Sequence, residues 1–468
     1  MVFSSPLFLS LFLPVLLLVY AFAQEQLRNA VLLAASLLFY SWGEPKACLV
    51  MLGLILVNYI SAIAIDRSTN SGTRKWLLAL AILANLSALF FYKYLDFTIG
   101  NMNALLSCFS LPELPLFNIS LPIGISFYCF QAMSYTIDVY RKEVEAQYSL
   151  ARLALYISLF PQLVAGPIVR YSTICNELND RSLQLDNVYE GLVRFCIGLA
   201  KKVFIADSMG YVADQIFVEQ VGTIPQLWAW VGCIAYTLQI YYDFSAYSDM
   251  AIGLGRVFNF HFLENFDFPY SATSIKDFWR RWHISLSSWL RDYLYIPLGG
   301  NRISAVRTYL NQFIVFFLCG LWHGASWNFA VWGVWHGSGL ILERFAGGGT
   351  SRLPKFLRNL YVLLFVMIGW VFFRSPDLGY ACDYLRIMFA GNHAYNMFSF
   401  MPAWANFITI SNGLFMLIGI IFAYPIRIFT FRYLQDKYAG MAMMALLFVA
   451  TYVFAMTSTF SPFIYFRF

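Results

Sequence analysis

The chain has 468 residues, of which 60% are hydrophobic and 12% are charged, and its formal net charge is +6. An ordinary soluble domain carries about 25% charged residues, so a soluble globular protein is excluded and the lipid bilayer is the expected solvent. Nucleic-acid binding is not expected either, because no soluble basic domain is present to perform it.

The first 23 residues form an apolar segment with two interpretations. Residues 7–23 are a continuous apolar run, which is typical of a membrane helix. Ala21, Phe22 and Ala23 also resemble a signal-peptidase site, but residues 1–10 lack the basic residues with which a signal peptide opens. We therefore expect this segment to be retained as a first span.

Further long apolar runs follow along the chain. They are residues 47–65, 76–92, 228–242, 309–321, 360–373, 414–424 and 441–456. A membrane-spanning helix needs ~20 apolar residues, so the shorter runs are expected to be tilted, broken or buried among their neighbours. The pattern predicts an all-α polytopic membrane protein with about ten to twelve transmembrane or re-entrant helices. We expect a single integral-membrane domain over residues 1–468.

Two apolar stretches are interrupted by proline and glycine. Residues 121–128 read LPIGISFY, and residues 160–167 contain both Phe160-Pro161-Gln162 and Ala165-Gly166-Pro167. These residues predict broken or re-entrant helices. Such backbone persists at membrane depth only where protein or a water-filled cavity satisfies its polar groups.

Residues 256–307 are the least membrane-like part of the chain. Aromatic and basic residues alternate there without a clean apolar run, which predicts an interfacial helical segment. The largest basic cluster of the chain also lies there: Lys276, Arg280, Arg281, Arg291, Arg302 and Arg307. This cluster fits the positive-inside signal of a cytoplasmic loop. A structural interfacial helix and a functional role both remain open, because His283 lies inside the segment.

Carboxylates end the apolar run that begins near Trp228. Asp243 and Asp249 occur in this stretch, and buried carboxylates need partners. We expect Arg256, two helical turns after Asp249, to pair with it.

Five histidines and eight cysteines complete the set of candidate reactive side chains. No CxxC pair is present, so neither a disulfide framework nor a zinc site is expected. His323 follows an apolar run, where a titratable group is costly and usually functional. His336 has a similar Trp-His-Gly context, but on one continuous helix the two rings would face different sides. We expect His336 to have a structural or supporting role and not to form a metal pair with His323.

Four longer motifs resemble the membrane-bound O-acyltransferase family, in its bacterial alginate O-acetylation branch. They are residues 243–253 (DFSAYSDMAIG), 278–287 (FWRRWHISLS), 289–301 (WLRDYLYIPLGGN) and 320–325 (GLWHGA). The first five residues and residues 121–128 also fit this branch. The resemblance covers residues 1 to about 375, whereas residues 381–459 match only in hydrophobicity.

The resemblance implies a many-helix fold around a central tunnel in the bacterial inner membrane. The family histidine of the Trp-His-Gly motif falls on His323, which becomes the favoured catalytic residue, and a second family histidine falls on His283. The resemblance implies that acetyl-CoA is the donor and that no cofactor or metal is bound. The implied partners are a periplasmic SGNH-type acetyltransferase and a polysaccharide synthase or export complex, with alginate or cellulose as the polymer.

The last seven residues, 462–468 (PFIYFRF), form a C-terminal aromatic motif. It resembles the terminus of a small partner protein of the D-alanylation system that is thought to carry the acyl group. Tyr465 is then the candidate acyl acceptor. The alternative is an aromatic anchor at the membrane interface.

These residues lead to a mechanistic hypothesis. His323 would act as general base on an acceptor hydroxyl, and a histidine pKa near ~6.5 suits this role. His283 would orient the donor or stabilise developing charge. Tyr465 would hold the acetyl group as an aryl ester before a second handover.

Two other functions remain open. The same fold and His323 would serve an acyltransferase that acts on a lipid, a protein or a cell-wall acceptor. A membrane transporter also uses broken helices and intramembrane polar residues, although no two related halves are evident in this sequence.

Overall fold

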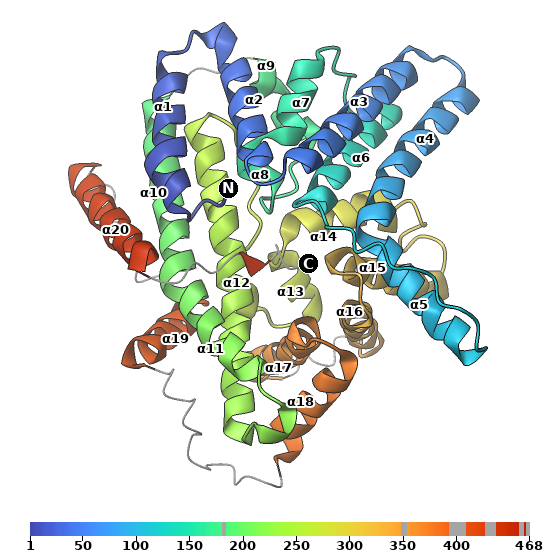
Figure 1. Ribbon diagram of the computed structural model, residues 1–468, viewed down its shortest axis with the longest axis vertical. Coiled ribbons are helices and arrows are strands. Elements are labelled where there is room, and N and C mark those ends of the chain that lie inside the picture. Colours follow the sequence, from blue (N-terminus) through green and yellow to red (C-terminus); the bar gives the residue numbers. More distant parts are fainter. Residues whose placement is uncertain (180–183, 348–352, 393–408, 426–436, 458–462, 465–468) are drawn as a thin grey trace. The chain divides into compact units, whose positions relative to one another are not determined.

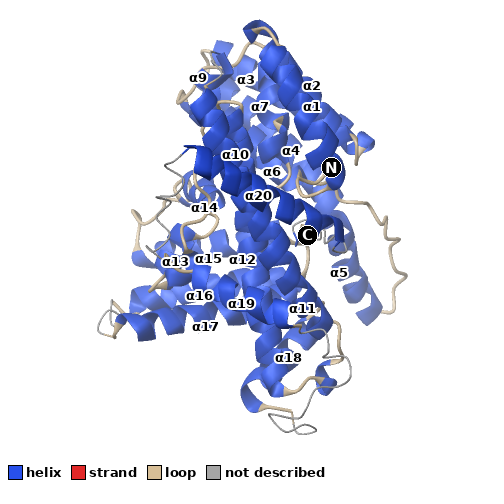
Figure 2. Cartoon of the chain, turned by 90° about the vertical axis from the view of Figure 1, so that its left-hand side faces the viewer, coloured by secondary structure: helices blue, strands red, loops and turns tan. Residues whose placement is uncertain are grey.

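The computed structural model describes residues 1–468 apart from 180–183, 348–352, 393–408, 426–436, 458–462 and 465–468. Helices make up the regular structure of this described part, and no strand occurs in it (Figure 2). The prediction of an all-α protein is therefore confirmed. The chain folds into two compact units, residues 1–195 with 250–263 and residues 196–249 with 264–468.

The first unit is built from the N-terminal helices (Figure 1), where η denotes a short 3-10 or π-helical element. In chain order they are η1 (Phe8–Phe12), α1 (Leu13–Phe22), α2 (Glu25–Ser41), α3 (Pro45–Arg67), α4 (Ser71–Leu89), η2 (Phe90–Tyr94), α5 (Leu95–Cys108), α6 (Ile125–Arg141), α7 (Leu150–Ser158), α8 (Phe160–Leu163), α9 (Tyr171–Asn179) and α10 (Leu185–Ala200), whose last turn belongs to the second unit.

Three helices of the first unit are joined by a buried polar network. Asn58 on α3 and Asn85 on α4 exchange two amide hydrogen bonds of 3.2 and 3.1 Å. The hydroxyl of Thr136 on α6 donates to Asn58 Oδ1 over 2.9 Å. All three side chains are fully buried, so each polar group finds its partner inside the protein.

The two predicted interruptions meet in the first unit. Helix α6 begins after Gly124, which has a φ of +77° that favours glycine. A Cβ atom on Gly124 would lie 2.7 Å from the backbone oxygen of Leu163 in α8. Helix α7 ends at Ser158, just before the second interruption. The second interruption is thus confirmed as a break between α7 and α8, whereas residues 121–124 precede the start of α6 and break no helix, because α5 already ends at Cys108. The glycine lets the start of α6 approach the backbone of α8.

The second unit contains the remaining helices. They are η3 (Lys201–Ala206), α11 (Asp207–Phe217), η4 (Val221–Thr223), α12 (Gln226–Val257), η5 (Pro269–Ser271), α13 (Ile275–Arg281), α14 (Ile284–Leu290), η6 (Arg291–Tyr295), α15 (Ala305–His323), α16 (Trp327–Phe345), α17 (Lys355–Arg374), α18 (Leu378–Ala390), α19 (Ile410–Phe422) and α20 (Lys437–Thr457). From Met250 onward, α12 belongs to the first unit.

Helices α15 and α16 pack closely along each other because glycines face glycines and bare backbone. A Cβ atom on Gly320 would lie 2.2 Å from the backbone oxygen of Phe329 and 3.1 Å from the Cα of Gly333. A Cβ on Gly333 would lie 2.2 Å from the backbone oxygen of Phe316. Small residues are the usual means by which membrane helices approach this closely. This hairpin fixes the position of His323.

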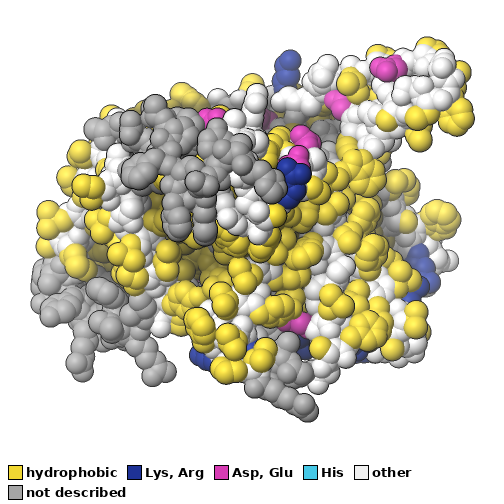
Figure 3. Space-filling model, turned by 90° about the horizontal axis from the view of Figure 1, so that it is seen from below, with side chains coloured by type: hydrophobic (Ala, Val, Ile, Leu, Met, Phe, Trp, Pro, Cys, Tyr) yellow, Lys and Arg dark blue, Asp and Glu magenta, His cyan; other side chains and the backbone are white. Residues whose placement is uncertain are grey.

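Four helices of the described part are long and apolar enough to cross a membrane. They are Pro45–Arg67, Ser71–Cys108, Ala305–His323 and Lys355–Arg374. Large apolar side chains remain exposed on their surfaces, such as Leu49, Leu56 and Ile60 on α3. Hydrophobic side chains also cover much of the face shown in Figure 3, where charged side chains are scattered. Contiguous exposed apolar surface of this kind fits contact with lipid.

One sequence prediction about ion pairs is wrong. Asp249 pairs with Lys201 over 2.7 Å, and Arg256 pairs with Glu190. The expected pairing along α12 fails because partners on other segments of the chain reach each charge.

Candidate active site

His323 is the last residue of α15 and lies in an aromatic enclosure. Its ring centroid is 4.9 Å from that of Trp322, 5.0 Å from that of Trp332 and 5.3 Å from that of Phe373. The side chain is 3% exposed. A titratable ring among aromatic groups at the end of a membrane-length helix is costly to maintain, which favours a functional role.

His283 is fully buried and is oriented by Asn265. The backbone N–H of Ser285 donates to Asn265 Oδ1 over 3.1 Å, which identifies that atom as the oxygen of the amide. His283 Nδ1 lies 3.2 Å from the same oxygen. Because an amide oxygen only accepts, we assign the proton of the neutral imidazole to Nδ1. The lone pair of Nε2 is then available, and this atom has no hydrogen-bond partner among the described residues.

The backbone and the burial of His283 both support this assignment. His283 has a φ of +44° at the N-terminus of α14, an uncommon conformation for a residue with a side chain. Burial lowers the pKa of His283 to about 3, so the ring is neutral near pH 7. A neutral ring with a fixed Nδ1 proton accepts hydrogen bonds at Nε2 and does not donate them there.

The structure brings the two predicted site histidines to the same indole. The ring of Trp322 is 6.1 Å from that of His283 and 4.9 Å from that of His323. His323 comes from α15 and His283 from the start of α14, so the two helices deliver the two imidazoles to one cluster.

His336 lies in the same unit but is held by a protein donor. The indole N–H of Trp279 donates to His336 Nδ1 over 3.3 Å, and the side chain is fully buried. His323 and His336 are on separate helices, and both rings contact Trp332. These contacts fit the expected supporting role of His336.

The other two histidines are not part of this cluster as described. His261 belongs to the first unit, is exposed, and its Nδ1 lies 2.7 Å from Glu177 Oε1. His393 lies outside the described residues. Within the described part of the chain, no group of three or more histidine, cysteine or acidic side chains is arranged to hold a metal ion.

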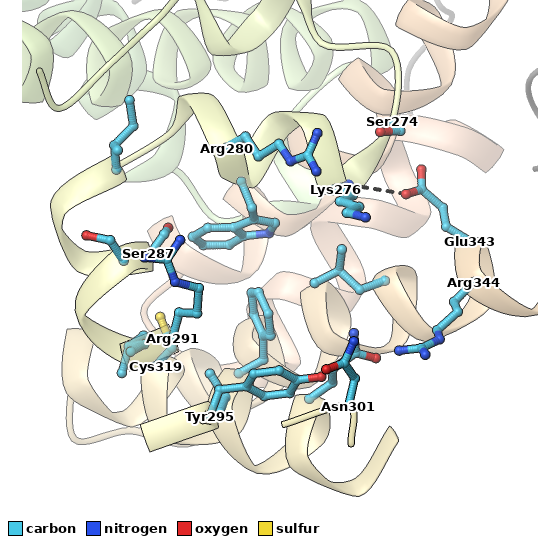
Figure 4. A pocket seen from close by; sticks show the side chains of 18 of the residues that line it. Ser274, Lys276, Arg280, Ser287, Arg291, Tyr295, Asn301, Cys319, Glu343 and Arg344 are labelled. Carbon is cyan, nitrogen blue, oxygen red and sulfur yellow. Dashed lines mark hydrogen bonds between the residues drawn. The ribbon is translucent and has the colours of Figure 1, made fainter. Parts of the chain in front are cut away.

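A cavity of about 1020 Å³ opens between α13, α14, α15 and α16 (Figure 4). Its lining includes four cationic side chains and one carboxylate, those of Lys276, Arg280, Arg291, Arg344 and Glu343. The Glu343 carboxylate accepts the backbone N–H groups of Ile275 and Lys276 at the start of α13. Burial raises the pKa of Glu343. The cavity is thus positively charged and large enough for a cofactor-sized anion.

One face of α15 leads from this cavity to His323. Gln312, Phe316 and Cys319 line the cavity and follow each other at spacings of three and four residues. His323 is four residues beyond Cys319 on the same helix. Residues at these spacings share one helix face. The cavity and the imidazole therefore lie along the same side of α15.

Tyr465 lies outside the described residues, but the two residues before it are described. Phe463 and Ile464 are buried in the second unit, at 1% and 2% exposure. The ring of Phe463 is 6.2 Å from that of Phe244, and Phe244 is 4.6 Å from the ring of His283. The chain end before Tyr465 is thus one aromatic ring away from His283.

Sequence reasoning missed Asn265 and the contribution of Trp279. Asn265 is an ordinary polar residue 18 positions before His283, in a segment without helical periodicity. Trp279 was recognised as part of a basic and aromatic segment, but its hydrogen bond to His336 depends on the packing of α13 against α16. Only the folded arrangement identifies either role.

The chain is similar to a family model and to several known enzymes. The model of the membrane-bound O-acyltransferase family matches residues 140–375. The probable alginate O-acetylase AlgI of Pseudomonas aeruginosa is 44% identical over 393 residues, which cover 83% of this chain and 75% of the relative. The peptidoglycan O-acetyltransferase of Helicobacter pylori is 37% identical over 424 residues, which cover 83% and 80%. The teichoic acid D-alanyltransferase of Bacillus subtilis is 28% identical over 240 residues, which cover 48% and 59%.

These matches decide between the two classes of function that the sequence left open. The family and the relatives are acyltransferases, so the alternative of a pure transporter is rejected. The apolar helices agree with a membrane location. The chain belongs to the membrane-bound O-acyltransferase family and is an O-acyltransferase of its polysaccharide O-acetylation branch.

Proposed function

We propose that this enzyme takes an acetyl group from cytoplasmic acetyl-CoA and relays it across the bacterial inner membrane for O-acetylation of an exopolysaccharide. A periplasmic SGNH-type acetyltransferase, working beside a polysaccharide synthase or export complex, would complete the transfer to a polymer such as alginate or cellulose. The 44% identity to probable alginate O-acetylases supports this choice of polymer class. In this proposal the two units form one integral-membrane domain, with about ten to twelve membrane segments around a central tunnel.

The cationic cavity is the observation that carries this proposal. Coenzyme A bears several phosphate groups, which bind arginine and lysine side chains well. Four cations and one carboxylate line the cavity, which leaves an excess of positive charge even though Arg291 is paired with Asp292. Basic loops favour the cytoplasmic side, where acetyl-CoA is found. The residues that line the cavity come from the 256–307 segment and from α15 and α16, which fits an interfacial entrance that leads toward His323.

Replacing Arg280 with alanine is expected to raise the KM for acetyl-CoA about tenfold with little change in kcat. A hydrogen bond to a charged group contributes about 1.5–3 kcal/mol, and tenfold corresponds to about 1.4 kcal/mol. Steady-state kinetics of the purified enzyme measure both constants. The matched control is Arg281→Ala, because Arg281 is bound by Asp267 and Asp277 and does not line the cavity. Equal KM changes in the two variants would argue against a donor site here.

In the proposed chemistry, Tyr465 accepts the acetyl group. His323 removes the phenol proton, and the phenolate oxygen attacks the thioester carbonyl of acetyl-CoA. The carbon–sulfur bond breaks, and the CoA thiolate leaves with the proton that His323 returns. His283 would orient the donor by accepting a hydrogen bond from it at Nε2, which agrees with the tautomer fixed by Asn265; in this tautomer Nε2 cannot donate to a developing negative charge. A phenol pKa of ~10 leaves the aryl ester reactive enough for a second transfer to a serine hydroxyl.

Replacing Tyr465 with phenylalanine tests the relay. Wild-type enzyme incubated with labelled acetyl-CoA is expected to gain one acetyl group on its C-terminal peptide, detected by mass spectrometry. Tyr465→Phe is expected to lose this label and to abolish acetate on the secreted polymer. Tyr211→Phe, a change at an exposed tyrosine of α11, is the matched control. Full polymer acetylation by Tyr465→Phe would reject the relay and favour the aromatic anchor.

A cell-wall acceptor is the second candidate, because the Helicobacter pylori relative is a peptidoglycan O-acetyltransferase. The same donor site and His323 would serve it. Ester-linked acetate measured separately in secreted polymer and in purified peptidoglycan decides between the two, since deletion of the enzyme is expected to remove acetate from only one of them. A lipid or protein acceptor would leave both unchanged.

A further inference from the structure

The chain end before Tyr465 is bound to α12 by a buried carboxylate. The backbone N–H of Ile464 donates to Asp243 Oδ2 over 2.7 Å, across 221 positions of sequence. The ring of Phe463 is 4.8 Å from that of Tyr247. Asp243 and Tyr247 are one helical turn apart, so they present a carboxylate and a ring on the same face of α12. Two consecutive residues of the chain end are thus held by one helix face.

Asp243 also forms an ion pair with a buried lysine. Lys202 Nζ lies 2.7 Å from Asp243 Oδ1 and 2.7 Å from Asp207 Oδ1, and Lys202 is 3% exposed. A buried carboxylate is costly unless an ion pair and hydrogen bonds compensate it. Here Oδ1 faces the lysine and Oδ2 faces the chain end, so each oxygen of Asp243 has its own partner.

The cluster contains one more carboxylate than is needed to pair with Lys202. Asp207 alone would neutralise Lys202, so Asp243 adds a second negative charge to a buried site. The Oδ2 atom of Asp243 accepts the backbone N–H of Ile464, and hydrogen bonds to a carboxylate are among the stronger ones. Because the donor is backbone, the contact fixes the path of the chain and not the identity of its side chain.

We propose that Asp243 is a positioning residue that fixes the backbone next to Tyr465 and so holds the acceptor phenol for acyl transfer. This inference rests on the proposed function of Tyr465. Phe244, the neighbour of Asp243 on α12, packs between Phe463 and His283, with ring distances of 6.2 and 4.6 Å. The anchor point is therefore adjacent to the histidine cluster. A held acceptor raises its effective concentration at the reacting carbonyl, and release of the anchor lowers the rate of the chemical step.

Two substitutions act on the same hydrogen bond from opposite sides, one by removing its donor and one by weakening its acceptor. Ile464→Pro removes the donor because proline has no backbone N–H, and Asp243→Asn removes the charge of the acceptor. Ile464→Val keeps the N–H and is the control for the first. Asp214→Asn is the control for the second, because it removes the charge of another carboxylate of the same unit, one that is paired with Arg374.

The first measurement is the rate at which Tyr465 is acetylated in the full-length purified enzyme. Asp243→Asn and Ile464→Pro are each expected to slow it at least tenfold, with the KM for acetyl-CoA unchanged, and both controls are expected to match wild type. The double variant is expected to be no slower than Ile464→Pro alone, since both changes remove one interaction. A further loss in the double variant, or a raised KM in Asp243→Asn, would show that Asp243 acts elsewhere and would overturn the proposal.

The second measurement does not depend on acyl transfer. Carboxypeptidase is expected to release Ile464 and Phe463 at least tenfold faster from Asp243→Asn than from wild type and from Asp214→Asn. Equal release from Asp243→Asn and Asp214→Asn would show that Asp243 does not hold the chain end. If wild-type Tyr465 gains no acetyl group while this release pattern is observed, the relay fails and the anchor stands.

Discussion

Replacement of His323 with alanine is expected to lower acetyl transfer by a factor of about 10²–10⁴, the usual contribution of a general base. The loss follows from the removal of the imidazole that accepts the proton of the acceptor hydroxyl. Because His323 lies in a closed aromatic enclosure, alanine also leaves a cavity there. His323→Gln keeps most of the side-chain volume and is expected to lose activity to the same extent.

The measurement is acetate on the secreted polymer, together with label transfer from acetyl-CoA to purified protein. His261→Ala is the matched control, because His261 is exposed and belongs to the other unit. The His323→Gln variant is expected to accumulate in the membrane at the wild-type level. Retention of acetyl transfer in His323→Gln would remove this residue from the catalytic role.

Replacement of Gly320 with valine is expected to destabilise the protein by about 3 kcal/mol and to leave little folded enzyme. The first added carbon would lie 2.2 Å from the backbone oxygen of Phe329, and backbone cannot move aside as a flexible side chain can. Helices α15 and α16 would have to separate, which would also displace His323 at the end of α15.

Thermal unfolding of the detergent-solubilised protein and the fraction that elutes as a single species measure this effect. Gly53→Val is the matched control, since Gly53 is also in a long apolar helix and a Cβ there would have no protein atom within 4 Å. Similar unfolding temperatures for the two variants would contradict the close packing of α15 against α16.

Local pattern in the sequence was enough to predict the helices and the candidate base. Apolar runs predicted helices such as α3 and α17, and proline with glycine predicted the break before α8, whereas before α6 the same residues mark only the start of a helix. His323 could be selected because an imidazole after an apolar run is rare whatever the fold is. Each of these features is contained in a short stretch of chain.

Features that depend on distant segments could not be predicted. The amide of Asn265 meets His283 only because the loop before α13 returns to α14, and Asp243 meets Ile464 across 221 positions. The error at Asp249 has the same origin. Helical spacing favoured Arg256, but Lys201 on η3 reaches Asp249 first in the folded chain. Periodicity describes one element and carries no information about which elements become neighbours.

The amide pair between α3 and α4 sets the alignment of these two membrane-length helices. Apolar side chains alone would let one helix slide along the other at little cost, because a leucine side chain is solvated equally well by lipid and by a neighbouring helix. Asn58 and Asn85 bond reciprocally, so a shift of one residue breaks both hydrogen bonds and leaves two amides unsatisfied in an apolar interior. The hydrogen bond from Thr136 to Asn58 then fixes the position of α6 against α3. The α3–α4 hairpin therefore has a fixed axial position relative to α6. In a bilayer of different thickness we expect these three helices to tilt together and not to slide past one another.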